Sequence, residues 1–160
     1  LLPILVVDVY KLESEAYGFL ISLIGLGSLM GSIFIAFIGK WKRGLLLVLG
    51  IFVSANALLL IGLIPDYSIA AILMIFLGLG STAPMTINMA LIMDNTEDMF
   101  RGRMMSIIMM QWGLMPIGVL PFSWLIEKFG GQFAVLTMSL ILFIVAVYIF
   151  FFNLKVRNLD

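Results

Sequence analysis

The sequence contains no cysteine and no histidine, and only 11% of its 160 residues are charged. Without cysteine the chain has no disulfides and no thiolate chemistry. Nine lysines and arginines balance nine aspartates and glutamates, so no net charge favours binding to nucleic acid. An intramembrane enzyme would need a nucleophile with a base, a metal site or paired aspartates in the bilayer. The composition therefore indicates neither an enzyme nor a metal or cofactor site.

What the chain has in excess is apolar side chains. Hydrophobic residues make up 63% of the sequence, and the mean hydropathy is +1.21. A soluble domain is nearer half apolar and a quarter charged, so this chain has too little polar surface to cover itself in water. The composition predicts an integral membrane protein.

Five stretches are long and apolar enough to cross a bilayer, for which about 20 residues are required. They cover about residues 16 to 38, 45 to 64, 68 to 93, 104 to 126 and 133 to 152. The fourth contains Pro116 and Pro121, which membrane helices tolerate because neighbouring groups satisfy the freed backbone. Residues 1 to 7 look like the end of a sixth helix whose start is missing. The predicted fold is all-α, a polytopic membrane bundle.

The cations divide unequally between the two sets of loops. Loops on one side, with the tail after residue 152, hold Lys40, Lys42, Arg43, Arg101, Arg103, Lys155 and Arg157. The opposite side holds Lys11 and Lys128. Cytoplasmic loops carry an excess of lysine and arginine. We therefore expect a multi-pass protein of the cell membrane with a cytoplasmic C-terminus.

Three features of the sequence resemble one transporter family. Gly31 and Gly39 precede the basic loop KWKRG, EDMFRGRMMS places Arg101-Gly102-Arg103 after an acidic run, and a glycine-rich span comes before the basic loop. This pattern resembles the C-terminal half of a major facilitator superfamily transporter, nearest the enterobactin exporters and macrolide-efflux proteins. The resemblance implies that residues 1 to 160 are helices 7 to 12. It also implies a missing N-terminal half.

The same resemblance implies a secondary transporter that exports amphipathic, drug-like or siderophore-like molecules by alternating access. Its partners would be a small-molecule substrate, the lipid bilayer and the missing half. A non-transporting membrane scaffold or accessory subunit is the alternative function.

The resemblance assigns a gating role to the cytoplasmic loops. The residues concerned are Gly39, Lys40, Lys42, Arg43, Asp94, Glu97, Arg101, Gly102 and Arg103. Where the family usually has an acid after the second glycine, this chain has Lys40, so the family's latch is altered. The acids Asp94, Glu97 and Asp98 lie on the same membrane face and could pair with the basic loop. Alternatively, the basic residues mark topology alone.

Two predicted spans carry the polar side chains that could contact cargo. Ser81, Met85 and Asn88 share one face of the third whole span, and Gln111 and Met115 share a face of the next. By resemblance the third span lines the transport cavity. The alternative for each amide is a hydrogen bond between helices. Ten of the twelve methionines lie from Met74 to Met115 and suit a pocket for varied apolar shapes, or simply a lipid-facing surface.

Small residues form a seam in the first whole span. Gly27 and Gly31 have the GxxxG spacing, with Gly25 nearby. Small residues allow helix backbones to approach closely in lipid. The seam is either a gliding contact between two halves of a transporter or a static contact between helices.

Overall fold

The computed structural model describes residues 14–38 and 43–152, and this part of the chain is helical. Its α-helices are α2 (Ser14–Ile38), α3 (Arg43–Leu63), α4 (Tyr67–Asp94), α5 (Arg101–Phe129) and α6 (Gly131–Phe152), with a 3₁₀ turn η2 (Asp98–Phe100) before α5. All five α-helices are long and apolar enough to cross a membrane. The predicted all-α membrane fold is confirmed. The expected helix at residues 1 to 7 lies outside the described residues.

The helix ends follow local side-chain chemistry. Asp66 caps α4 by accepting hydrogen bonds from the backbone N–H groups of Ser68 and Ile69, at 2.8 and 3.1 Å. These two donors have no partner within the helix, and the cap satisfies them. At the end of α5, Gly130 adopts a φ of 85°, a conformation that costs glycine little. This glycine allows α6 to begin at the next residue and run back across the membrane.

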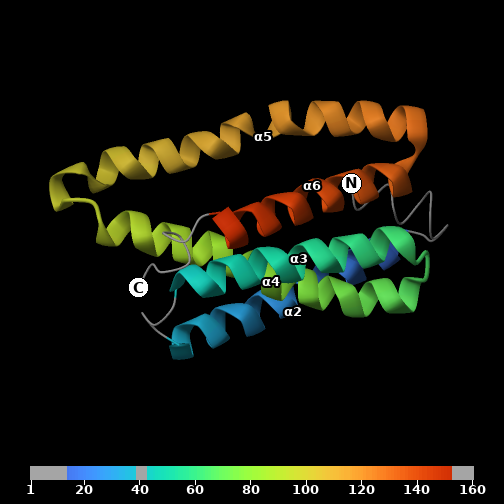
Figure 1. Cartoon of the computed structure of the whole chain (residues 1–160), viewed down its shortest axis with the longest axis horizontal. Helices are drawn as coiled ribbons and strands as arrows, with labels where there is room; N and C mark the ends of the chain where they lie inside the picture. The colour runs from blue at the N-terminus through green and yellow to red at the C-terminus, as the bar shows by residue number, and fades with distance from the viewer. Residues whose placement is uncertain (1–13, 39–42, 153–160) are drawn as a thin grey trace.

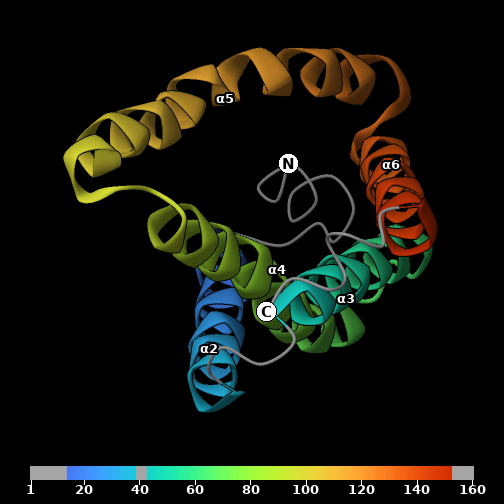
Figure 2. The ribbon, with the colours of Figure 1, turned by 60° about the vertical axis from the view of Figure 1, so that its left-hand side comes forward.

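Four of the helices pack in the order α2, α4, α3, α6, which differs from their order along the chain (Figures 1 and 2). One residue from each forms a buried cluster, namely Leu20, Ile61, Met74 and Val135. A second cluster, of Leu47, Ala83 and Ile87, lies between α3 and α4. Helix α4 therefore lies between α2 and α3 and packs against both of them.

Helix α5 stands apart from these four. It arcs over them (Figure 2) and makes its main contacts with η2 and α6, the elements on either side of it in the chain. None of its 29 residues is buried. Pro116 and Pro121 lie inside it, and prolines in a helix remove backbone hydrogen bonds and favour bending. The side chains of α5 that face α4 therefore border an open space.

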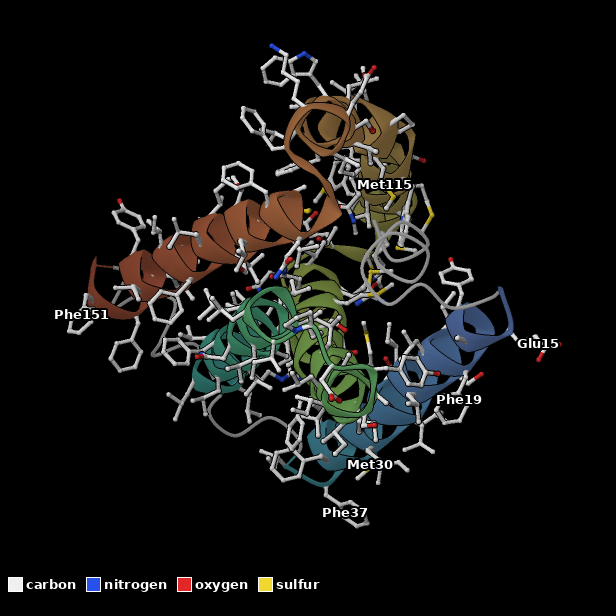
Figure 3. All side chains as sticks on the ribbon, turned by 90° about the vertical axis from the view of Figure 1, so that its right-hand side faces the viewer. Glu15, Phe19, Met30, Phe37, Met115 and Phe151 are labelled. Atoms are coloured by element: carbon white, nitrogen blue, oxygen red, sulfur yellow. The ribbon has the colours of Figure 1, made fainter. Side chains whose placement is uncertain are left out.

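Large apolar side chains point outward around the bundle (Figure 3). Phe37 is 88% exposed and Phe151 is 67% exposed. In water such a surface would be an aggregation hazard. In a bilayer it faces hydrocarbon, so the exposed surface agrees with the predicted membrane location.

Candidate functional site

The polar side chains of α4 and α5 meet at a pocket of about 660 Å³ between the two helices. Its lining consists of Ser81, Pro84, Met85, Asn88, Met89, Ile92, Ile108, Met109, Gln111 and Trp112. Pockets that hold small molecules usually measure about 300 to 1,000 Å³. We call this space the α4–α5 pocket.

Two side-chain amides line the α4–α5 pocket, one from each helix. Asn88 on α4 and Gln111 on α5 are both exposed to it. Within the described residues neither amide makes a hydrogen bond to another part of the chain. The described structure therefore does not use these amides to join helices. Their donors and acceptors are available to a bound molecule.

Apart from the Ser81 hydroxyl, most of the other lining side chains are apolar, and several of them are flexible. Met85 and Met89 come from successive turns of α4, Met109 comes from α5, and the indole of Trp112 lies beside them. Thioether side chains adapt to different apolar shapes. Among the described residues of the lining none is charged. The arrangement can hold an amphipathic molecule through apolar contact and a few hydrogen bonds.

Two local features of α4 distinguish its side facing the α4–α5 pocket from its side facing α3. Ser81 donates to the carbonyl of Gly78 at 3.0 Å, and Thr82 donates to the same carbonyl at 2.8 Å.

Pro84 has no N–H, so the carbonyl of Gly80 lacks its usual partner within the helix. That carbonyl lies against α3, 2.6 Å from where a side chain on Gly50 would begin. The α3 side of α4 is therefore tightly packed, while the pocket side is free.

Four of the five cavity residues predicted from the sequence line the α4–α5 pocket, namely Ser81, Met85, Asn88 and Gln111. Met115 does not line it. It lies one turn further along α5, where it is 60% exposed (Figure 3). The prediction also missed Met89 and Met109. Both belong to the group of ten methionines from Met74 to Met115, and Met89 also follows Met85 by one helical turn, a spacing that could have identified it.

A second groove, of about 820 Å³, runs between α2 and α4. It shares Ser81 and Met85 with the α4–α5 pocket, so these two residues form the wall between the two spaces. Its hydroxyl groups bond to backbone carbonyls, as when Ser22 donates to Gly18 at 2.9 Å and Ser32 to Leu29 at 2.8 Å. With these donors occupied, the groove offers a bound molecule less hydrogen bonding than the α4–α5 pocket.

The predicted glycine seam packs against α4. A Cβ atom on Gly27 would overlap the backbone carbonyl of Ile75, and one on Gly31 would lie 2.9 Å from the carbonyl oxygen of Leu79. Gly25, in contrast, has open space beside it and lines the α2–α4 groove instead. Within the described residues, Gly27 and Gly31 therefore make a contact inside this bundle, and Gly25 is not part of that contact.

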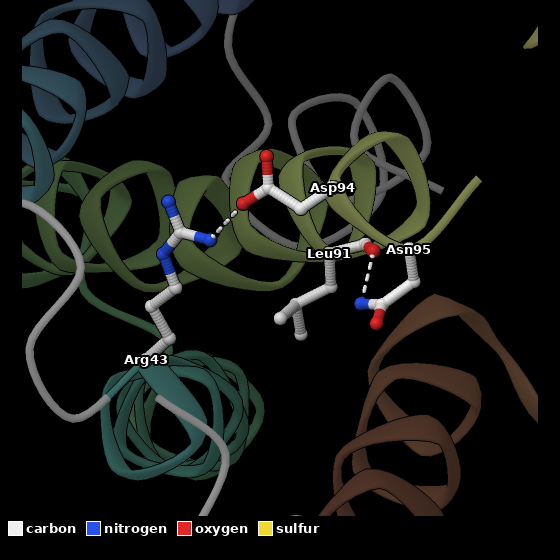
Figure 4. A network of polar contacts seen from close by, with 4 residues as sticks. All are labelled: Arg43, Leu91, Asp94 and Asn95. Carbon is white, nitrogen blue, oxygen red and sulfur yellow. Dashed lines mark hydrogen bonds and ion pairs between the residues drawn. The ribbon is translucent and has the colours of Figure 1, made fainter. Parts of the chain in front are cut away.

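Charged residues gather where α3 begins and α4 ends (Figure 4). The Arg43 guanidinium donates to the Asp94 carboxylate at 2.7 Å, and Arg43 is 14% exposed while Asp94 is 47% exposed. Beside them the Asn95 amide donates to the carbonyl of Leu91 at 2.8 Å. Of the cations that the sequence offered to these acids, the structure pairs Arg43 with Asp94. Gly39, Lys40 and Lys42 lie outside the described residues.

The arginines at the start of α5 find partners on η2. Arg101 contacts Asp98 at 2.8 Å, and the Arg103 guanidinium lies 5.7 Å from the centre of the Phe100 ring. These contacts offset the unfavourable position of two cations at a helix N-terminus. Glu97 precedes η2 and is exposed, and Gly102 has no neighbour within 4 Å of a Cβ atom.

Comparisons with known proteins place the chain in a family. The chain is 28% identical over 160 residues to the staphyloferrin A transporter of Staphylococcus aureus (strain NCTC 8325 / PS 47). The aligned region covers 98% of this chain and 40% of the relative, so the chain spans less than half of that protein's length. No solved structure matches. The Major Facilitator Superfamily profile matches residues 1–159, and the chain therefore belongs to the Major Facilitator Superfamily.

Proposed function

We propose that this chain is the C-terminal half of a secondary transporter that exports amphipathic small molecules by alternating access. The observation that carries the proposal is the α4–α5 pocket, with unpaired amides on its two helices and thioethers between them. A membrane scaffold has no need of such a pocket. Family membership supports transport, whereas export is our own inference from the sequence resemblance.

The lining of the pocket suggests which part of a cargo molecule binds there. Asn88 and Gln111 can each donate and accept hydrogen bonds, and Trp112 offers a flat apolar face. The cargo would place an uncharged polar group between the amides and an apolar surface against Trp112 and the methionines. The relative is named for staphyloferrin A, a siderophore, which supports the siderophore-like class of cargo.

A complete transporter of this kind needs a second bundle that rocks against this one around a site near the middle of the membrane. The chain spans 40% of its relative, which leaves length in that protein for another bundle. We propose that an N-terminal half of the same protein faces the α4–α5 pocket. The whole would lie in the cell membrane with the C-terminus of this chain in the cytoplasm.

The charged residues at the ends of α3 and α4 would then control access from the cytoplasmic side. The Arg43–Asp94 pair holds these two helix ends together, and Arg101 and Arg103 fix the start of α5 through η2. Because both groups of contacts lie at the same end of the pocket helices, movement of α5 relative to α4 would begin there.

The test is efflux by the full-length protein in a bacterial host that lacks its own exporters. Cells are preloaded with ethidium or made to produce staphyloferrin A, and the initial rate of export is measured. We expect Asn88→Ala to lower the rate about fivefold, the equivalent of one lost hydrogen bond of about 1 kcal/mol. The control is Asn56→Ala, since Asn56 bonds to the Phe52 carbonyl within α3 and does not line the pocket.

The scaffold alternative predicts a different result. If neither molecule leaves cells that express the folded wild-type protein faster than cells with an empty vector, the export proposal fails for these cargo classes. Equal rates for Asn88→Ala, Asn56→Ala and wild type, with export present, would instead locate the binding site elsewhere.

A further inference from the structure

Three methionines line the α4–α5 pocket, and they come from both of its helices. Met85 and Met89 belong to α4, and Met109 belongs to α5. Met85 is 65% exposed and Met109 is 52% exposed, so neither side chain is enclosed in the packing between helices. The two helices therefore present three thioether sulfurs to one space.

The spacing of the methionines on α4 allows two sulfurs to reach one bound ion. Residues four apart on a helix lie on the same face, with Cβ atoms about 5 to 6 Å apart. Two histidines at this spacing hold a single zinc ion in one class of metal sites. Met85 and Met89 have the same spacing, and the rotatable bonds of methionine allow its sulfur to turn toward an ion. Met109 offers a third sulfur from the facing helix.

The other side chains of the pocket decide which kind of ion suits it. The described lining contains no charged side chain, and the described residues hold no group of three His, Cys, Asp or Glu side chains that could bind a metal ion. Ca²⁺ and Mg²⁺ are bound mainly by carboxylates and other oxygen ligands, and structural zinc sites use thiolate or imidazole. Thioether sulfur is a soft ligand that favours Cu(I) instead.

We propose that Met85, Met89 and Met109 bind one soft monovalent metal ion, Cu(I) or Ag(I), in the α4–α5 pocket. A single positive charge suits a site without anionic ligands, because the cost of moving an ion out of water rises steeply with its charge. The indole of Trp112 belongs to the same lining, and its ring face attracts cations. This site goes beyond the export of an organic molecule and does not require it.

A purely apolar role of the three methionines predicts a different response to substitution. Leucine has a volume close to that of methionine, and exchange of the two usually costs little in packing. A pocket that uses the thioethers only as flexible apolar surface therefore binds metal no differently when leucine replaces them. A metal site loses one ligand with each exchange, so the exchange separates the two roles.

The experiment measures Ag(I) binding by isothermal titration calorimetry in chloride-free buffer, with purified full-length protein freed of other cysteines. We expect wild type to bind Ag(I), and the single variants Met85→Leu, Met89→Leu and Met109→Leu to bind it more weakly. Loss of an outer-shell partner alone weakens metal binding about 10- to 100-fold, so loss of a ligand should weaken it at least about tenfold. The control Met110→Leu, at a position 64% exposed beside Met109 but outside the lining, should bind as wild type does.

Fluorescence locates the bound ion independently of its affinity. A heavy ion quenches the emission of an indole beside it, so Ag(I) should quench the wild type. Trp112→Phe should remove most of this quenching, because Trp112 lines the pocket. Trp124→Phe is the control and should retain it. Trp124 lies outside the lining, where the Lys128 ammonium is 4.5 Å from the centre of its ring.

The outcomes that overturn the proposal follow from the same titrations. They are a wild type that binds no Ag(I), equal affinities of the wild type and the three pocket variants, and a loss in Met110→Leu as large as in Met109→Leu. Binding of Zn²⁺ as tight as that of Ag(I) also overturns it, since thioethers do not favour zinc. Each variant is first shown to be folded by size-exclusion chromatography. None of these results depends on transport, so the export proposal is decided separately by the efflux assay.

Discussion

The guanidinium of Arg43 lies 2.7 Å from the carboxylate of Asp94, joining the first residue of α3 to the last residue of α4 (Figure 4). The two residues are 51 positions apart in the sequence. Arg43 is mostly buried, which shields the pair from solvent on one side. Pairs that are partly shielded in this way contribute more than fully exposed ones.

Removing either partner of this pair should destabilise the full-length protein. We expect Arg43→Gln and Asp94→Asn each to lower the thermal unfolding temperature, and the double variant to be little worse than either single one. The coupling energy in a double-mutant cycle should be about 1 kcal/mol. The matching cycle on Asp98 and Arg101, whose side chains are 87% and 51% exposed, should give almost none. Strictly additive effects at Arg43 and Asp94 would contradict the pairing.

The contact between α2 and α4 should depend on Gly27 and not on Gly25. In Gly27→Ala the added methyl meets the backbone carbonyl of Ile75, which cannot move without shifting a helix. Overpacking of this kind costs about 1 to 3 kcal/mol. We expect a lower unfolding temperature and a lower yield of folded protein, measured by size-exclusion chromatography after heating. Gly25→Ala should behave as wild type because its added methyl meets open space.

Gln111 and Met115 should differ in their effects on export, although the sequence proposed both. Gln111 lines the α4–α5 pocket and Met115 does not. Gln111→Leu keeps a similar volume and removes the amide, so we expect the KM for cargo to rise about fivefold with little change in kcat. Met115→Leu should leave both constants unchanged. The reverse order of effects, measured in the same efflux assay, would place the cargo further along α5.

The orientation of the chain can be tested with single cysteines, because this chain contains none of its own. In a full-length protein freed of other cysteines, we expect Pro65→Cys to react with an impermeant maleimide in intact cells. Glu97→Cys should react only after the cells are opened. Both positions are exposed and lie at opposite ends of α4. Labelling of Glu97→Cys alone in intact cells would reverse the predicted topology.

The sequence by itself determined the spans and their class. Each crossing needs about 20 apolar residues with all backbone groups bonded inside the helix, so long apolar runs predict helices directly. The predicted span of about 68 to 93 agrees with α4, which runs over Tyr67–Asp94. Helical periodicity also placed Ser81, Met85 and Asn88 on one face, and the three line one pocket.

Only the tertiary structure decided which faces meet. The sequence grouped Gly25 with Gly27 and Gly31, but Gly25 faces a groove, and Met115 lies beyond the pocket that Gln111 reaches. It left open which cation pairs with which acid. The physical reason is that lipid is as apolar as a neighbouring helix, so an apolar pattern does not identify a helix's partner. Close fit between particular surfaces makes that choice, and the fit exists only once the helices are assembled.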